Sequence, residues 1–272
     1  MWICSIVHGD TTMSTNVHYI KNRKERQLSR KRRRSNLKFK EQYQDNTVEF
    51  QKYAPKQRNI RLHPKSLRQE SYIDLLTDPD KMIVFATGPA GTGKTMLAVL
   101  AGLQAYREGQ VNKIILTRPA VGVDDEQHGF LPGDINQKME PWTRPLFDIM
   151  HEYYSPKETA KMLDEGIIEI SPLAFMRGRT FKDAWIIADE MQNATPGQMK
   201  MLLTRLGQGS KMVVTGDTRQ ADRKEADNGL LNFESLCNSY EELNYVGGVK
   251  MLGKDIHRHP AVVEVLQIYS EI

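Results

Sequence analysis

Short apolar runs alternate with amphipathic segments from Pro64 onward. The apolar runs are continuous, which is typical of strands buried on both faces of a sheet, and they predict strands at 82–86, 113–117, 167–170, 184–188, 211–215 and 245–252. Apolar positions at helical spacing predict helices at 66–76, 96–106 and 196–206. Strands and helices that alternate in this way predict an α/β fold with a mainly parallel sheet and helices on both faces.

One segment does not fit this alternation. The residues from Ala120 to about Lys161 mix glycine, proline and helix-forming residues over a length greater than a crossover between two strands needs. We interpret this segment as an insertion on the rim of the sheet. The sequence contains no internal repeat.

Residues 1–55 form a polar and strongly charged arm, which we expect to be disordered, and residues 56–272 are predicted to form one domain. Within the arm, residues 21–40 contain eleven lysines or arginines and a single acidic residue, Glu25. A block of this kind can bind the phosphate backbone of a nucleic acid or another anionic surface, but it is equally compatible with a solvated tail. Nothing in residues 1–12 resembles a structural element, which leaves Met13 as an alternative start.

Composition excludes several classes of protein. No apolar run approaches the roughly 18 to 20 residues that span a bilayer, and residues 2–7 lack the preceding basic residues of a secretory signal. Cys4 and Cys237 give neither a disulfide framework nor the spacing of metal ligands, and the histidines are scattered except for His257 and His259. We therefore expect a soluble, cytoplasmic protein (in the host cytoplasm if the chain is viral) without a membrane partner or a metal site built from protein ligands alone.

The most specific pattern follows the first predicted strand, where a glycine-rich turn ends in Lys94 and Thr95 and leads into an apolar helix. Glycines let the backbone wrap a phosphate closely, the lysine reaches the β and γ phosphates, and the threonine hydroxyl can bind Mg²⁺. The alternative is a glycine turn without a ligand. The pattern predicts a P-loop that binds a nucleoside triphosphate, with the candidate binding residues Gly88, Pro89, Ala90, Gly91, Thr92, Gly93, Lys94, Thr95 and Met96.

Two later strands also end in polar residues. Asp189 and Glu190 follow the strand at 184–188, and we predict that Asp189 binds Mg²⁺ while Glu190 activates a water molecule. Asp217 and Gln220 follow the strand at 211–215, where they could sense the γ-phosphate or position water. Without the P-loop, these would be a solvated strand end and an Asp-bearing turn.

Six ordered motifs across residues 60–265 resemble the PhoH family, whose ATPase domain is related to the first motor domain of superfamily 1 helicases. They are TGPAGTGKT (87–95), TRPA (117–120), FMRGRTF (175–181), ADEMQN (188–193), TGDTRQ (215–220) and DIHRH (255–259). The resemblance implies a RecA-like fold and a role for Gln69 in reading the adenine edge of ATP. It also implies that Arg118 and Arg258 face phosphate or nucleic acid, whereas residue chemistry alone makes Arg118 a charge after a strand and Arg258 part of a helix-entry turn.

The sequence departs from the family in two respects. Met191 stands where many members have a small residue, and the basic arm is too short to fold as the additional ribonuclease domain that some relatives carry. We also expect no second motor domain after residue 272, so any movement of nucleic acid would need an oligomer. The resemblance suggests that this oligomer is a ring, for which a hexamer is one candidate. A neighbouring subunit would then supply the arginine that stabilises the γ-phosphate charge, with Arg258 the first choice ahead of Arg219 and Arg223.

These observations together predict a Mg²⁺-dependent ATPase that associates with RNA or another single-stranded nucleic acid and acts as a homo-oligomeric, helicase-like motor or remodelling protein. One alternative is a P-loop kinase that passes the γ-phosphate to a small acceptor. The other is a nucleotide-gated RNA-binding protein with little turnover.

Overall fold

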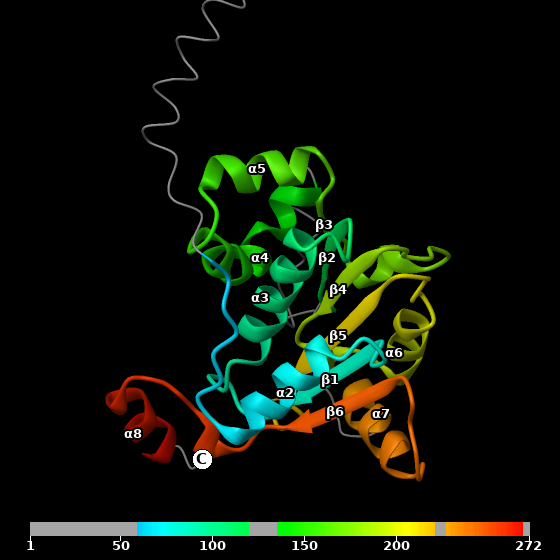
Figure 1. Cartoon of the computed structure of the whole chain (residues 1–272). Coiled ribbons are helices and arrows are strands. Elements are labelled where there is room, and N and C mark those ends of the chain that lie inside the picture. Colours follow the sequence, from blue (N-terminus) through cyan, green and yellow to red (C-terminus); the bar gives the residue numbers. More distant parts are fainter. Residues whose placement is uncertain (1–58, 120–134, 221–226, 269–272) are drawn as a thin grey trace, which may run out of the picture. The chain divides into compact units, whose positions relative to one another are not determined.

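The computed structural model of the 272-residue chain describes residues 59–119, 135–220 and 227–268, with the backbone alone described at 135–142 (Figure 1). The predicted arm at residues 1–55 lies outside the described residues, and so does Arg223. No helix in these three ranges is long and apolar enough to cross a membrane.

The described residues contain one six-stranded sheet in which every neighbouring pair of strands is parallel. Its strand order is β3-β2-β4-β5-β1-β6, with β3 and β6 at opposite edges (Figure 1). The strands are β1 (Ile83–Thr87), β2 (Lys113–Thr117), β3 (Ile168–Ile170), β4 (Ala184–Ala188), β5 (Lys211–Gly216) and β6 (Val246–Lys250). All six predicted strands are confirmed within one or two residues of their bounds, and the sheet is wholly rather than mainly parallel.

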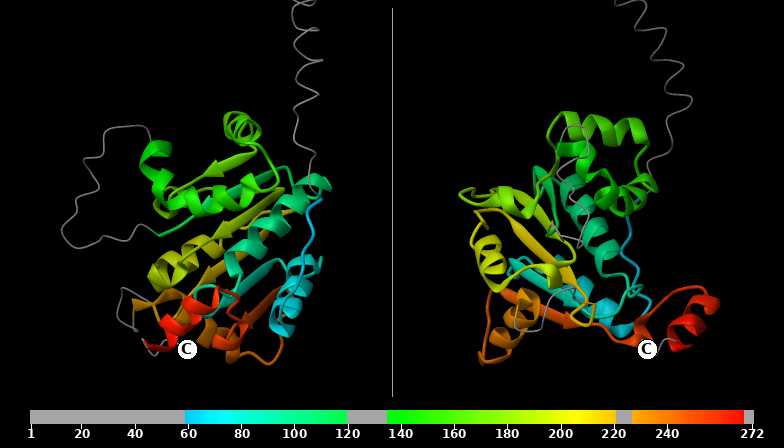
Figure 2. Two further views of the ribbon diagram at one scale, coloured as in Figure 1. Left: turned by 90° about the vertical axis from the view of Figure 1, so that its left-hand side faces the viewer. Right: turned by 180° about the vertical axis from the view of Figure 1, so that it is seen from behind.

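Helices cover both faces of this sheet, as the views in Figures 1 and 2 show. One face carries α2 (Leu67–Thr77), α3 (Lys94–Arg107), α4 (Ile135–His151) and α5 (Pro156–Asp164), and the other carries α6 (Pro196–Leu203) and α7 (Gly229–Asn238). Short 3₁₀ helices lie between these elements, among them η2 (Leu173–Met176), η3 (Met191–Asn193) and η5 (Gly253–Asp255). Helix α8 (Pro260–Ile268) buries no residue. The α/β prediction with helices on both faces is thus confirmed.

The continuous apolar runs are explained by two hydrophobic clusters, one on each side of the sheet. Along β2, Ile114 and Leu116 enter the cluster beneath α3, while Ile115 enters the cluster on the opposite face. Because successive side chains of a strand point to opposite faces, a strand covered on both sides needs an apolar residue at every position.

The prediction of a rim insertion after β2 is wrong for its helical part. Helices α4 and α5 form the crossover from β2 to β3 and contribute Leu146, Met150 and Met162 to the cluster beneath α3. Tyr154, between the two helices, is buried in the same cluster, and its hydroxyl accepts a hydrogen bond from Nε of Arg107 at 2.8 Å. Residues 120–134 of the same stretch lie outside the described residues.

The topology determines where a ligand can bind. Strands β2, β4, β5 and β1 are consecutive neighbours in a parallel sheet, so their carboxyl ends meet at one edge. The P-loop follows β1, Asp189 and Glu190 follow β4, and Asp217 follows β5. Residues spread over more than a hundred positions are therefore brought to one place.

Candidate nucleotide-binding site

The loop at 88–93 joins β1 to α3 and has the backbone geometry of a phosphate cradle. Gly88 has φ +130°, and a Cβ atom there would lie 2.4 Å from the carbonyl oxygen of Met251, so only glycine fits. Gly93 has φ +83° and directly precedes α3. Since the first N–H groups of a helix have no partner within the helix, this end of α3 can donate to an anion.

Lys94 is the first residue of α3, and its ammonium group folds back over the loop. Nζ donates hydrogen bonds to the carbonyl oxygens of Gly88 (2.6 Å) and Pro89 (2.8 Å). Burial lowers the pKa of this ammonium group, while neighbouring carboxylates, foremost that of Asp217, act in the opposite direction. The charge is thus held close to the loop, where phosphate oxygens could replace the two carbonyls as acceptors.

Thr95 and Asp189 lie in direct contact. The Thr95 hydroxyl donates to Oδ1 of Asp189 at 2.8 Å, and the Thr215 hydroxyl at the end of β5 donates to the same oxygen at 2.5 Å. Hydroxyl and carboxylate oxygens are hard ligands that suit Mg²⁺, which usually binds one or two carboxylates together with substrate phosphates. Among the described residues no cluster of three His, Cys, Asp or Glu side chains could bind a metal. The hydroxyl of Thr95 and the carboxylate of Asp189 are the kinds of ligand that fit a Mg²⁺ ion bound together with phosphate.

Glu190 is fixed in an unusual backbone conformation beside this pair. Its φ is +56°, a left-handed value uncommon outside glycine, and it directly precedes η3. The buried amide of Gln192 donates from Nε2 to Oε2 of Glu190 at 2.5 Å, and its Oε1 accepts from the N–H of Asp217 at 3.1 Å. One side chain thus links the carboxylate after β4 to the turn after β5. Local strain of this kind is often found where a side chain must be aimed at a ligand.

The turn after β5 is held by its own acidic residue. Asp217 is buried, and its Oδ1 accepts from the N–H of Arg219 at 3.0 Å. Its carbonyl oxygen accepts from the N–H of Gln220 at 3.1 Å, which places the exposed Gln220 at the rim of the same site.

Gln69 connects α2 to the P-loop. It is buried, and its Nε2 donates to the carbonyl oxygen of Thr92 at 2.9 Å, while its Oε1 accepts from the N–H of Lys65 at 2.7 Å. An amide group offers two N–H donors and two acceptor lone pairs, so one of each remains for an adenine edge. The role of Gln69 in reading adenine stays a prediction. Its hydrogen bond to Thr92 also helps to position the P-loop.

Arg258 lies against the P-loop of its own chain. A Cβ atom at Gly91 would be 2.8 Å from Nε of Arg258, and the N–H of His257 donates to the carbonyl oxygen of Gly91 at 3.2 Å. Asp255 anchors the segment: its buried carboxylate accepts from the N–H of Leu252 at 2.8 Å and lies 3.7 Å from Arg68. The path of the chain after β6 thus brings Arg258 to the site of its own chain, which favours a role there over the predicted contact with a neighbouring subunit.

These groups surround one cavity of about 460 Å³. The predicted residues that line it are Gln69, Ala90, Gly91, Gly93, Lys94, Thr95, Met96, Arg118, Asp189, Glu190, Asp217, Gln220 and Arg258. Gly88, Pro89 and Thr92 do not line it. Their carbonyl oxygens accept hydrogen bonds from the side chains of Lys94 and Gln69, which do line it.

A known protein family and individual proteins are similar to most of this chain. The family model described as "PhoH-like protein" matches residues 61–270 of the chain. The chain belongs to the PhoH family. It is 45% identical over 210 residues to a PhoH-like protein of Bacillus subtilis (strain 168), covering 76% of this chain and 63% of the relative. A PhoH-like protein of Mycobacterium tuberculosis (strain H37Rv) is 44% identical (77% and 58% covered), and Protein PhoH of Escherichia coli K12 is 39% identical over 193 residues (70% and 53% covered).

This PhoH-family chain spans between 53% and 63% of the length of those relatives. Among solved structures, the Sulfolobus solfataricus SWI2/SNF2 ATPase core in complex with dsDNA matches with a TM-score of 0.33 and 13% identity, covering 59% of this chain and 32% of that chain. A similarity of that size carries no argument.

Sequence reasoning missed several residues of this PhoH-family site. Gln192 lies within the ADEMQN motif, and the structure adds a role for it, because its side chain joins Glu190 to Asp217. His257 contacts Gly91 through its backbone, and Ile149 of α4 lines the cavity. An amide two residues after a catalytic carboxylate is a signal that could have identified Gln192. The contribution of α4 depends on how it packs, so no local pattern could have revealed it.

Proposed function

We propose that the chain binds ATP with Mg²⁺ and hydrolyses it, using the cavity at the carboxyl ends of β1, β4 and β5. The observation that carries this proposal is the convergence of Lys94, Thr95, Asp189 and Glu190 on one cavity. A P-loop NTPase is what the family and the fold support. Hydrolysis is the step that we add.

Each group has a role that follows from its chemistry. The loop amides and the Lys94 ammonium bind the phosphates, and Thr95 with Asp189 would hold Mg²⁺, which supplies positive charge to the β and γ phosphate oxygens when bound. Glu190 takes the proton from the attacking water, which needs a carboxylate held within reach of the γ-phosphate. Asp217 and Gln220 sense that phosphate from the turn after β5, and Arg258 neutralises the charge that develops on it.

Phosphate release measured without any acceptor tests the chemistry. Release of inorganic phosphate from ATP and Mg²⁺ alone supports water as the acceptor. If the γ-phosphate leaves ATP only after a small-molecule fraction is added, and appears on a component of that fraction, the chain is a kinase. The Gln192 contact favours water, because it holds the Glu190 carboxylate in place as the base that activates a water molecule.

We further propose that ATP turnover is coupled to single-stranded RNA, as in a helicase-like motor or remodelling protein working as a homo-oligomer. The supporting observation is the basic block at residues 21–40, which precedes a domain of the PhoH family in the sequence. ATPase rates with single-stranded RNA, with single-stranded DNA and without polymer test this coupling. A nucleotide-gated binding protein would instead show RNA affinity that depends on nucleotide, with little turnover under all three conditions.

A further inference from the structure

In the part of the chain that the structure describes, strand β6 ends the sheet and has one side without a neighbouring strand. The backbone of Tyr245 accepts from Ile83 at 3.0 Å, and Met251 donates to Thr87 at 2.7 Å. Backbone groups along a strand alternate in direction, so residues 245, 247, 249 and 251 face β1. Val246, Gly248 and Lys250 therefore direct their N–H and C=O groups away from the sheet, as a row that another strand could pair with.

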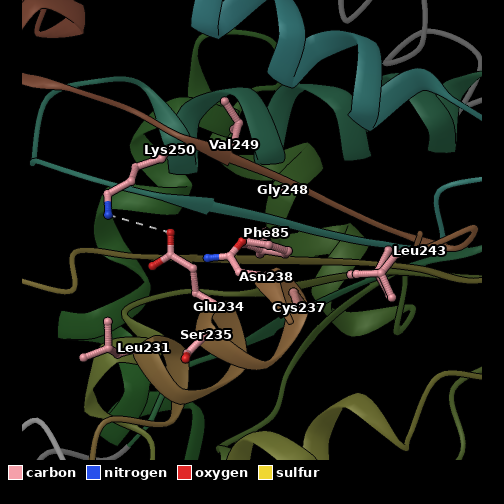
Figure 3. A pocket seen from close by; sticks show the side chains of 11 residues that line it. Phe85, Leu231, Glu234, Ser235, Cys237, Asn238, Leu243, Gly248, Val249 and Lys250 are labelled. Atoms are coloured by element: carbon pink, nitrogen blue, oxygen red, sulfur yellow. Dashed lines mark ion pairs between the residues drawn. The ribbon is translucent and has the colours of Figure 1, made fainter. Parts of the chain in front are cut away.

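A hollow lies beside this row, between β6 and α7 (Figure 3). Its volume is about 560 Å³. Gly248 lets the Phe85 ring form one wall of it, because a Cβ atom at this position would lie 2.1 Å from Cζ of Phe85. The Phe85 ring thus forms part of the wall beneath a glycine, and Leu231 and Cys237 of α7 lie opposite (Figure 3).

The ends of the hollow differ in polarity. At one end the carboxylate of Glu234 accepts from the Thr87 hydroxyl at 3.2 Å and lies 4.0 Å from Nζ of Lys250 (Figure 3). At the other end Leu243 and Val246 provide apolar surface. Because Glu234 and Lys250 compensate each other's charge, an occupant needs no charge of its own.

Exposed apolar side chains also occur on α7 and in the connection from α7 to β6, the two segments that adjoin the hollow. Leu236 of α7 is 53% exposed, and Tyr240 and Tyr245, in the connection from α7 to β6, are each 66% exposed. Apolar surface gathered around unpaired strand groups is typical of an interaction site.

We propose that this edge binds an extended, uncharged polypeptide segment of a partner protein, which adds a seventh strand beside β6. Its main chain pairs with the outward groups of Val246, Gly248 and Lys250. A large apolar side chain opposite Gly248 fills the hollow against Phe85, and smaller side chains lie two residues to either side. Main-chain bonds supply affinity in this mode of binding, and the hollow supplies selectivity.

Other occupants fit less well. A nucleic acid would bring phosphates to an edge that carries Glu234 and, in the nearby connection, Glu241 and Glu242. Pairing of two β6 strands about a twofold axis at Gly248 would place glycine opposite glycine and leave both hollows unfilled.

A defined peptide tests the proposal on the full chain. In the uncharged peptide acetyl-QSVTFTVSQ-amide the two valines and the phenylalanine share one face, and the palindromic sequence offers the same side chains in either direction. Its affinity, measured by calorimetry, is compared with that of two copies, one N-methylated at the phenylalanine and one at the threonine that follows it. Methylation at phenylalanine blocks antiparallel addition, whereas methylation at threonine blocks parallel addition. We expect one copy to bind at least about tenfold more weakly, because it loses a bond and introduces a clash.

Two variants locate the site. Val246→Pro removes an outward N–H that the ladder to β1 does not use, and it should abolish peptide binding, whereas Val246→Ala should keep the affinity within about threefold. Amide exchange adds a readout that does not depend on variants: the peptide should slow exchange at Gly248 and Lys250 and leave Gly247 and Val249 unchanged. ATP binding by both variants checks that they fold.

Three results would overturn the proposal: equal affinity for all three peptides, unchanged binding to Val246→Pro, or no binding of any peptide to the wild-type chain. If no peptide binds and sedimentation shows a smaller assembly for Val246→Pro than for Val246→Ala, the edge joins copies of this chain instead.

Discussion

Glu190→Gln is the substitution that separates hydrolysis from binding most sharply. Glutamine keeps the size of the side chain and an oxygen that can accept from Nε2 of Gln192, which contacts Glu190 at 2.5 Å. The left-handed backbone at φ +56° is equally demanding for both residues, so the substitution adds no new strain. What it removes is the basic carboxylate.

The expected effect on turnover is large. A positioned general base contributes about 10²- to 10⁴-fold, so the maximal rate of phosphate release should fall by that factor, equivalent to about 3 to 5 kcal/mol of activation free energy. ATP affinity should stay within about threefold. The binding groups Lys94 and Thr95 are unchanged, and among the carboxylates that favour the charged form of Lys94, Glu190 has the smallest effect on its pKa after Asp217 and Asp189.

Calorimetry with ATP and Mg²⁺ gives the affinity, and a phosphate-release assay at saturating ATP gives the rate. Glu108→Gln is the matched control, because Glu108 is exposed and lies outside the cavity, in contact with Gln104 and Gln110. If Glu190→Gln turns over within about threefold of the wild type while Glu108→Gln is normal, Glu190 does not activate water.

Four further outcomes are expected. Lys94→Ala should weaken ATP binding and abolish hydrolysis together, as calorimetry and phosphate release would report. A mixture of Lys94→Ala and Arg258→Ala chains should stay inactive even when native mass spectrometry shows mixed assemblies, because Arg258 lies in its own chain's site, and recovered activity would contradict that placement. Deleting residues 1–40 should lower RNA affinity and leave ATP affinity unchanged. The slope of log K against log salt should become less steep by about 0.7 for each lost phosphate contact. An unchanged slope would show that the arm is a passive tail. Burial lowers the pKa of Lys211 to about 8, below its value in the unfolded chain. Between pH 8 and about 10 the unfolded chain therefore binds more protons, and this group makes the folded state more stable as pH rises. The free energy of unfolding, measured in urea, should rise less over this pH range for Lys211→Met than for the wild type.

The sheet and the P-loop could be predicted because local sequence patterns indicate both. Each strand is buried on both faces and therefore reads as an apolar run, and the residue after the run necessarily lies at the carboxyl edge. Once the strands are parallel, Lys94, Asp189 and Asp217 must meet, whatever the loops between them do.

The features that sequence reasoning missed depend on contacts between distant segments. The link from Gln192 to Asp217 exists because Glu190 adopts a left-handed conformation, which no pattern around it indicates. The packing of α4 against α3 turns what reads as a rim insertion into part of the core and brings Ile149 to the cavity. Arg258 was assigned to a neighbour because its sequence position is close to the last helix, yet Asp255 and His257 hold it over Gly91.

Strand β6 connects the nucleotide site to the edge that we propose as a docking surface. Its last ladder bond, from Met251 to Thr87, holds the residue before Gly88, and the Met251 carbonyl packs so closely on Gly88 that no side chain fits between them. The chain then continues through η5 to Arg258. A displacement of β6 would therefore move a wall of the P-loop and the arginine beside it together, since tightly packed backbone cannot absorb the shift. A partner strand paired with the outer side of β6 would act on the same element that shapes the phosphate cradle.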